Sequence, residues 1–262
     1  MKKYFSIYKT LFILNWSIFT GYRANFLNSI FSSLLWGVFQ IITIFVLTAK
    51  TSSAFGWTRT ELFILISSFN IFIGFYHGIF SNNFERFSEI IHFGQLDGIL
   101  LKPMDSQFIL SLNHINFASF FRILLGIGFL EYLILQNHLQ INLIQIISFG
   151  TLLLIGLILL YSIWFCVMTL TMWFTKLSNL VELMYTFNGI TRYPKEMYQG
   201  LKGFLFIVIL PLSLIVSAPT KILLQRTNFL DILELLIFTL VFFIISRKFW
   251  KFALRFYTSA SS

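Results

Sequence analysis

The residues of this chain that could do chemistry are few, and their spacing forms no catalytic group. The single cysteine, Cys166, lies in an apolar run, so a disulfide within the chain is impossible. His77 and His114 have no second histidine at metal-binding spacing, so no metal site is predicted. A phosphate-binding GxxxxGK[ST] loop and a GxSxG nucleophile motif are both missing from the sequence. We therefore expect a protein that is not an enzyme and holds no cofactor.

Three ionisable side chains stand inside or beside long apolar runs. Arg122 and Glu131 are separated by about 13 Å along a helix, which is too far for a direct ion pair. They either extend to opposite membrane interfaces or line a path between helices. Glu182 either faces a substrate path or marks an interfacial segment. The sequence leaves each pair of alternatives open.

The composition indicates an apolar solvent for most of the surface. Of the 262 residues, 57% are hydrophobic and 11% are charged, against about 25% charged in soluble domains. The net charge of +9 could suggest nucleic acid. The basic residues instead bracket the apolar runs, from Lys2 to Arg23 and from Arg247 to Arg255, as the positive-inside rule predicts. We expect a lipid bilayer as partner, no nucleic acid, and both termini in the cytoplasm.

The hydropathy pattern predicts an all-α integral membrane protein with one domain over residues 1–262 and six transmembrane helices. A span needs about 20 apolar residues. Residues 1–25 are too polar for a span and predict an amphipathic helix at the interface. The expected spans cover residues 26–48, 62–81, 108–135, 141–174, about 178–192 or 201–219, and 229–246.

The fifth span has two possible placements. In the first, residues 201–219 cross the membrane and Pro211 interrupts them. In the second, the crossing ends near Tyr193 and Pro194, and the following segment is a re-entrant pair of half-helices broken near Pro211. Charge favours the first placement, because the second puts four basic residues outside, namely Lys195, Lys202, Lys221 and Arg226.

The segment from Ser81 to Phe108 is the most highly charged part of the chain. Phe84, Phe87 and Ile90 fall at helical spacing, which predicts an amphipathic surface helix, and Gly94 can end that helix. Apolar residues also stand among its charges. A solvated connector would not need them, so we interpret the segment as a cytoplasmic docking surface for a soluble partner.

This segment also carries a family resemblance. Its pattern I-x-x-G-x-L-D-x-x-L-x-K-P, which begins at Ile91, resembles that of ABC transporter permeases of the ABC-2 class. The order and spacing of further short motifs agree over nearly the whole chain. These are Phe55-Gly56-Trp57-Thr58 with Glu61-Leu62, then Arg192-Tyr193-Pro194, Tyr198, Gly200, Pro211 and Ala218-Pro219.

The resemblance implies a half-transporter of exporter type in a bacterial-type plasma (inner) membrane. Such permeases pair as homodimers or heterodimers, and a separately encoded ATPase, which carries the ATP and Mg, docks on their cytoplasmic loops. The implied coupling residues are Glu85, Glu89, Gly94, Leu96, Asp97, Leu100, Lys102 and Pro103. The resemblance favours the re-entrant placement, with an outer gate at Tyr193, Pro194, Pro211 and Pro219.

The expected substrate is amphipathic or hydrophobic, such as a drug, a lipid or a peptide, because the apolar lining would be rich in Phe and Leu. Arg122, Glu131 and Glu182 are candidate lining residues. The alternatives are a secondary transporter or channel that needs no ATPase, and a membrane-integral lipid enzyme.

Overall fold

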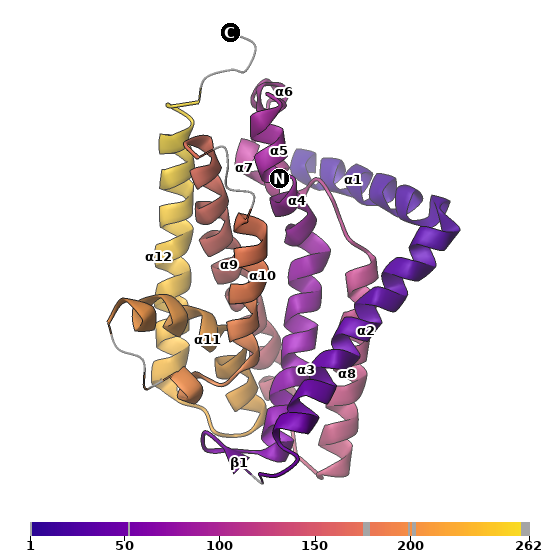
Figure 1. Ribbon diagram of the computed structural model, residues 1–262, viewed down its shortest axis with the longest axis vertical. Helices are drawn as coiled ribbons and strands as arrows, with labels where there is room; N and C mark the ends of the chain where they lie inside the picture. Colours follow the sequence, from indigo (N-terminus) through magenta and orange to yellow (C-terminus); the bar gives the residue numbers. More distant parts are fainter. Residues whose placement is uncertain (1, 52, 175–178, 199, 201–202, 258–262) are drawn as a thin grey trace.

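The protein is a bundle of α-helices with one short β-hairpin at its lower end (Figure 1). The computed structural model describes all residues except 1, 52, 175–178, 199, 201–202 and 258–262, and the side chains of residues 2–5 and 204–207 are also left undescribed. Within the described chain, five helical stretches are long and apolar enough to cross a bilayer. They cover Arg23–Leu47, Arg59–His92, Ala118–Gln136, Leu143–Met172 and Phe229–Ala253. The predicted all-α membrane fold is thus confirmed.

The N-terminal helices form an arm beside the bundle. Helix α1 (Lys2–Gly21) runs across the bundle direction at the upper end, and α2 (Arg23–Leu47) descends along α8 and α3 (Figure 1). The hairpin of β1 (Ser53–Ala54) and β2 (Trp57–Thr58) turns the chain into α3 (Arg59–Tyr76). Thr58 and Glu61 form a capping box at the start of α3, which fixes where this buried helix begins.

Short helices connect α3 to α8 at the upper end (Figure 1). A π-helical turn, η1 (His77–Ser81), leads into α4 (Asn82–Glu85), α5 (Phe87–His92), α6 (Leu96–Leu100) and α7 (Ser106–Leu112). Gly94 has a φ of +67° after the end of α5, the left-handed conformation that glycine adopts most readily. The predicted end of the surface helix is therefore confirmed.

The expected continuous helix over residues 108–135 is divided in two. Helix α7 ends at Leu112, and α8 (Ala118–Gln136) begins after a short non-helical joint. Two asparagine side chains bind the backbone that this break leaves unpaired. Asn15 on α1 donates to the Asn113 carbonyl at 2.9 Å, and Asn83 on α4 both donates to His114 O and accepts from His114 N at 2.8 Å. Sequence periodicity does not reveal such a break, because distant side chains stabilise it.

In the second half of the chain, α11 (Phe204–Leu223) is the helix most enclosed by its neighbours. Helix α9 (Leu143–Thr169, extended by η2, Leu170–Met172) contacts both α11 and α12 (Phe229–Ala253). Between α9 and α11 lie α10 (Leu180–Asn188) and the 3-10 turns η3 (Gly189–Arg192) and η4 (Lys195–Tyr198). Every residue of α11 from Pro211 to Leu223 is buried. From Pro211 to Leu223, α11 is therefore covered by protein rather than facing lipid.

The structure bears on this region in two ways, although the placement of the fifth span stays a prediction. Lys195 in η4 and Lys221 near the end of α11 both contact Asp231 at the start of α12. The chain between them therefore leaves the lower end and returns to it, instead of crossing the bundle. The second point is a correction, because α11 is one helix through Pro211 and Pro219, not two half-helices. Lys202, one of the four basic residues counted for this region, lies outside the described residues.

Candidate functional site

The charged segment of residues 82–105 projects from the upper end of the bundle (Figure 1). Its exposed residues include several predicted coupling residues, namely Glu85, Glu89, Leu100, Lys102 and Pro103. Phe93 and Leu101 add exposed apolar surface, with exposed fractions of 68% and 86%. Gly94 and Asp97 are partly buried, and Leu96 is fully buried against the core. Leu96 thus supports the segment from below, whereas Leu100 and Leu101 face outward.

An ion pair fixes the end of this segment to the last helix. Arg247 on α12 donates to both carboxylate oxygens of Asp105, at 2.9 and 2.7 Å, and to Gln107 at 2.8 Å. Trp250, one turn further along α12, donates to the Ser106 hydroxyl at 3.0 Å. Asp105 is also the N-cap of α7 and accepts from the Phe108 backbone. The start of α7 and the end of α12 therefore form one rigid corner.

A second contact joins the segment to α10. The Tyr185 hydroxyl on α10 donates to the Glu85 carboxylate at the end of α4, and the Tyr185 ring stacks on His77 with centroids 5.4 Å apart. Tyr185 and His77 both line a cavity between α2, α3, α8 and η3. The charged segment is thus connected directly to the wall of that cavity.

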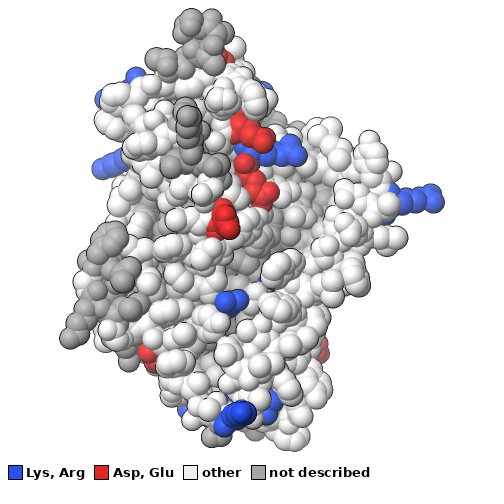
Figure 2. All heavy atoms as spheres, in the orientation of Figure 1, with Lys and Arg blue, Asp and Glu red and all other residues white. Residues whose placement is uncertain are grey.

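This cavity, which we call the basic cavity, has a volume of about 780 Å³. Its lining includes Arg122, Arg192 and His77, and among the described residues no aspartate or glutamate lines it. A polar stripe of α2 faces it at helical spacing, and the members of this stripe are Asn28, Ser29, Ser32, Ser33, Trp36 and Gln40. Figure 2 shows a hollow on this face between the α2 arm and the rest of the bundle, with acidic side chains gathered above it.

The two arginines of the basic cavity are bound by neutral groups. Arg122 donates from Nε to Asn70 at 2.8 Å and lies over the Phe69 ring. Arg192 donates from Nη1 to Gln40 at 3.0 Å and lies over the Tyr193 ring, while its buried Nε has no hydrogen-bond partner in the described structure. A carboxylate partner for either guanidinium is not found among the described residues. Arg122 therefore lines a cavity, one of the two alternatives that the sequence left open.

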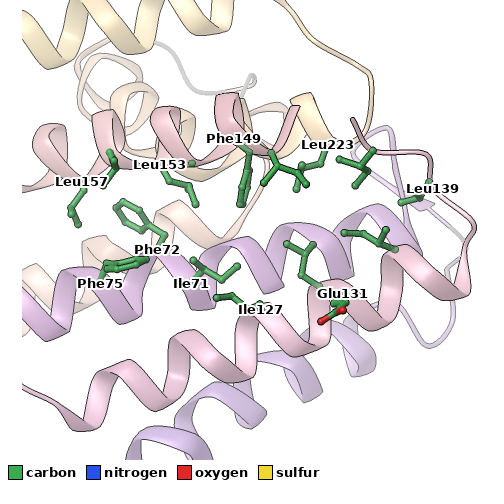
Figure 3. Close-up of a pocket in the computed structure, with 16 residues that line it drawn as sticks. Ile71, Phe72, Phe75, Ile127, Glu131, Leu139, Phe149, Leu153, Leu157 and Leu223 are labelled. Atoms are coloured by element: carbon green, nitrogen blue, oxygen red, sulfur yellow. The ribbon is translucent and has the colours of Figure 1, made fainter. Parts of the chain in front are cut away.

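Glu131 and Glu182 lie elsewhere. Glu131 stands on the wall of an apolar cavity of about 650 Å³ between α3, α8 and α9. Figure 3 shows Phe72 and Phe75 on one side of this cavity and Phe149, Leu153 and Leu157 on the other. Glu182 is an exposed residue of α10 that lines neither cavity.

The predicted gate residues lie around an ion-pair network at the lower end. Pro194, Pro211 and Pro219 are buried, and Tyr193 is partly buried. Lys221 pairs with Glu196 at 2.6 Å and with Asp231, and Lys195 pairs with Asp231 at 3.0 Å and with Glu234 at 2.7 Å. Burial lowers the pKa of Lys195, but its hydrogen bonds to Glu234 and Asp231 outweigh burial and raise that pKa above its ordinary value.

Three of the four basic residues that count against the re-entrant placement form ion pairs in the folded protein. Lys195, Lys221 and Arg226 each pair with at least one acid, Arg226 with Glu61 at 3.1 Å. Glu196 also accepts from the Trp57 indole at 2.9 Å, which ties the β-hairpin to η4. The positive-inside rule counts basic residues in loops and cannot see that folding pairs them with carboxylates.

Comparison with known proteins assigns the family. A family model described as ABC-2 family transporter protein matches residues 34–261. The chain belongs to this ABC-2 transporter family. It is accordingly a multi-pass membrane protein and a transport component, the permease subunit of an ABC transporter. A search of curated proteins found no match. The resemblance seen in the sequence is confirmed, and the match includes the whole charged segment and both arginines of the basic cavity.

Several site residues were not identified from the sequence. The α2 stripe could have been found, because Asn28, Ser32, Trp36 and Gln40 recur every four residues in an otherwise apolar helix. The sequence marks Arg192 only as part of the motif Arg192-Tyr193-Pro194. Its role in the cavity wall arises from tertiary packing, which sets η3 opposite α2.

Proposed function

We propose that the chain is the membrane half of an ATP-driven exporter for an amphipathic or hydrophobic substrate, with a separate ATPase subunit docked on residues 82–105. A second permease copy or paralogue would complete the transporter in a bacterial plasma membrane, with both termini in the cytoplasm. The ATP and Mg would belong to the ATPase. The observation that carries the proposal is the exposed surface of residues 87–102, which combines apolar side chains such as Leu101 with charges such as Glu89 and Lys102.

Two contacts connect this surface to helices of the bundle, so that movement of the surface would move those helices. Movement of α4 would act on α10 through Glu85 and Tyr185, beside the basic cavity. Movement of the segment's end would act on α12 through Asp105 and Arg247. Closure of two ATPase subunits could then shift α10 and α12 together and alternate the exposure of the cavity.

Substitution of the outward-facing leucines tests this proposal. Leu100→Glu with Leu101→Glu, in permease co-expressed with its candidate ATPase, should abolish ATPase co-purification and ATP-dependent transport. The matched control is Tyr22→Glu, since Tyr22 is 72% exposed and lies outside the segment. The variants should elute from size exclusion like the unmodified protein, which shows that the fold persists. Unchanged recruitment and transport in the double variant would refute the docking site. Transport without any ATPase would favour a secondary transporter instead.

A further inference from the structure

We propose that the basic cavity binds the oxyanion headgroup of an anionic amphiphile, a phosphate or carboxylate attached to an apolar chain. This inference rests on the proposed function, because it names the substrate class of the same permease. The cavity volume of about 780 Å³ falls within the usual range of ligand pockets.

The positive charge of the cavity favours an anionic headgroup. Arg122 and Arg192 are cationic side chains, and the described residues that line the cavity include no carboxylate to neutralise them. Glu85 accepts a hydrogen bond from the lining residue Tyr185 but does not itself line the cavity. A positive charge at membrane depth without an ionic partner is costly and usually serves a function. An anion entering the cavity would supply that partner.

The hydrogen bonding of the arginines selects an oxyanion. A guanidinium has five N–H donors in a planar fork that matches carboxylate and phosphate oxygens. One protein acceptor is recorded for each of the two arginines, Asn70 for Arg122 and Gln40 for Arg192. The Arg192 Nε is buried and without a partner in the described structure. The serines of α2 add hydroxyl donors on the facing wall.

The apolar residues of the remaining walls favour an amphiphile over a free ion. Trp36, Phe69 and Ile73 line the same cavity. Trp36 is 60% exposed, so the cavity opens beside the apolar outer face of α2. An alkyl chain could leave the cavity along this face while the headgroup stays with the arginines.

Equilibrium binding to the purified permease, without any ATPase, tests the inference. Radiolabelled dodecyl phosphate in a neutral detergent should bind at least about tenfold more tightly than dodecyltrimethylammonium or inorganic phosphate. Arg122→Gln and Arg192→Gln should each weaken dodecyl phosphate binding about tenfold, the usual effect of removing a charge-assisted hydrogen bond. Arg122→Lys keeps the charge, so it should retain part of the affinity and control for a folding defect.

Arg59→Gln is the matched control. Arg59 also lies over aromatic rings and has a buried Nε without a described partner, but it lines a different cavity, near Gln136 and Asn137. Its substitution should leave dodecyl phosphate binding unchanged. Equal binding of the cationic and anionic amphiphiles, or equal losses in the Arg59 and Arg122 variants, would overturn the inference. Inorganic phosphate binding as tightly as dodecyl phosphate would overturn the amphiphile assignment. Because the ATPase is absent, failure of the docking proposal leaves this result unaffected.

Discussion

Arg247 and Asp105 form a two-pronged ion pair that joins the last helix to the start of α7, across 142 positions of sequence. Figure 1 shows α12 and the projecting segment of α5 to α7 reaching the same upper end of the bundle. The two side chains are about one-third exposed. The pair can therefore hold the projecting segment in register with α12 while remaining near the surface.

Asp105→Asn should uncouple the segment from α12 with little loss of folding. It removes one carboxylate oxygen from a partly exposed pair, so we expect a loss of about 1 kcal/mol in unfolding free energy. ATP-dependent transport should fall far more than ATPase recruitment does. The neighbouring Lys248→Gln, at an exposed position of α12, should change neither. Full transport by the Asp105 variant would contradict this coupling role.

The same pair predicts a dependence on pH. Hydrogen bonds from Arg247, helped by the Phe108 backbone N–H and opposed by burial, hold the pKa of Asp105 below its ordinary value. A carboxyl group with a lowered pKa stabilises the fold above its unfolded pKa of about 3.9 and loses that effect as the pH falls through the folded pKa. The difference in thermal midpoint between unmodified protein and Asp105→Asn should be constant from pH 8 to 5. It should then shrink toward zero as the pH is lowered below 4.

Asp231→Ala should destabilise the lower end strongly. Asp231 is 2% exposed and pairs with both Lys195 and Lys221. Its removal leaves the buried Lys221 and the partly buried Lys195 with fewer partners, and breaking a buried pair costs roughly 3 kcal/mol or more. Glu234→Gln, at the exposed edge of the network, should cost below about 1 kcal/mol. Similar thermal midpoints for the two variants in detergent would show that burial does not set the strength of the network.

Labelling of single cysteines tests the re-entrant path. In a Cys166→Ala background, Met197→Cys in η4 and Thr227→Cys in the α11–α12 turn should react with a membrane-impermeant maleimide from the same side. Both positions are exposed at the lower end of the bundle. Leu101→Cys should react only from the opposite side. Labelling of positions 197 and 227 from opposite sides would mean that α11 crosses the membrane.

Gly74→Ala should disturb the contact between α3 and α8. A Cβ on Gly74 would lie 2.6 Å from the Ile123 side chain and 3.0 Å from the Ser119 carbonyl. Overpacking of this kind typically costs about 1–3 kcal/mol. Gly128→Ala on α8 meets nothing within 4 Å, so it should be neutral or stabilising because alanine favours helix. Thermal unfolding of the two variants in detergent provides the comparison.

The sequence determined the class of the molecule through properties that survive without a fold. Apolar run length, the position of basic residues and the pattern from Ile91 to Pro103 were enough for a multi-helix membrane protein of the ABC-2 family. Gly94 was identified as a helix end because glycine adopts the left-handed conformation most readily. The break between α7 and α8 was missed, since Asn15 and Asn83 stabilise it from distant helices.

Only the tertiary structure decided the path of α11 and the use of the charges. The sequence shows Lys195 and Lys221 only as loop charges, whereas Glu196, Asp231 and Glu234 pair with them in the folded protein. Leu96 and Leu100 look alike in sequence, yet one is buried in the core and the other faces outward. Arg122 and Arg192 are 70 positions apart and share one cavity. The sequence sets the number of charged and apolar residues. Packing decides which charges pair with a side chain of the same chain and which stay available for a ligand.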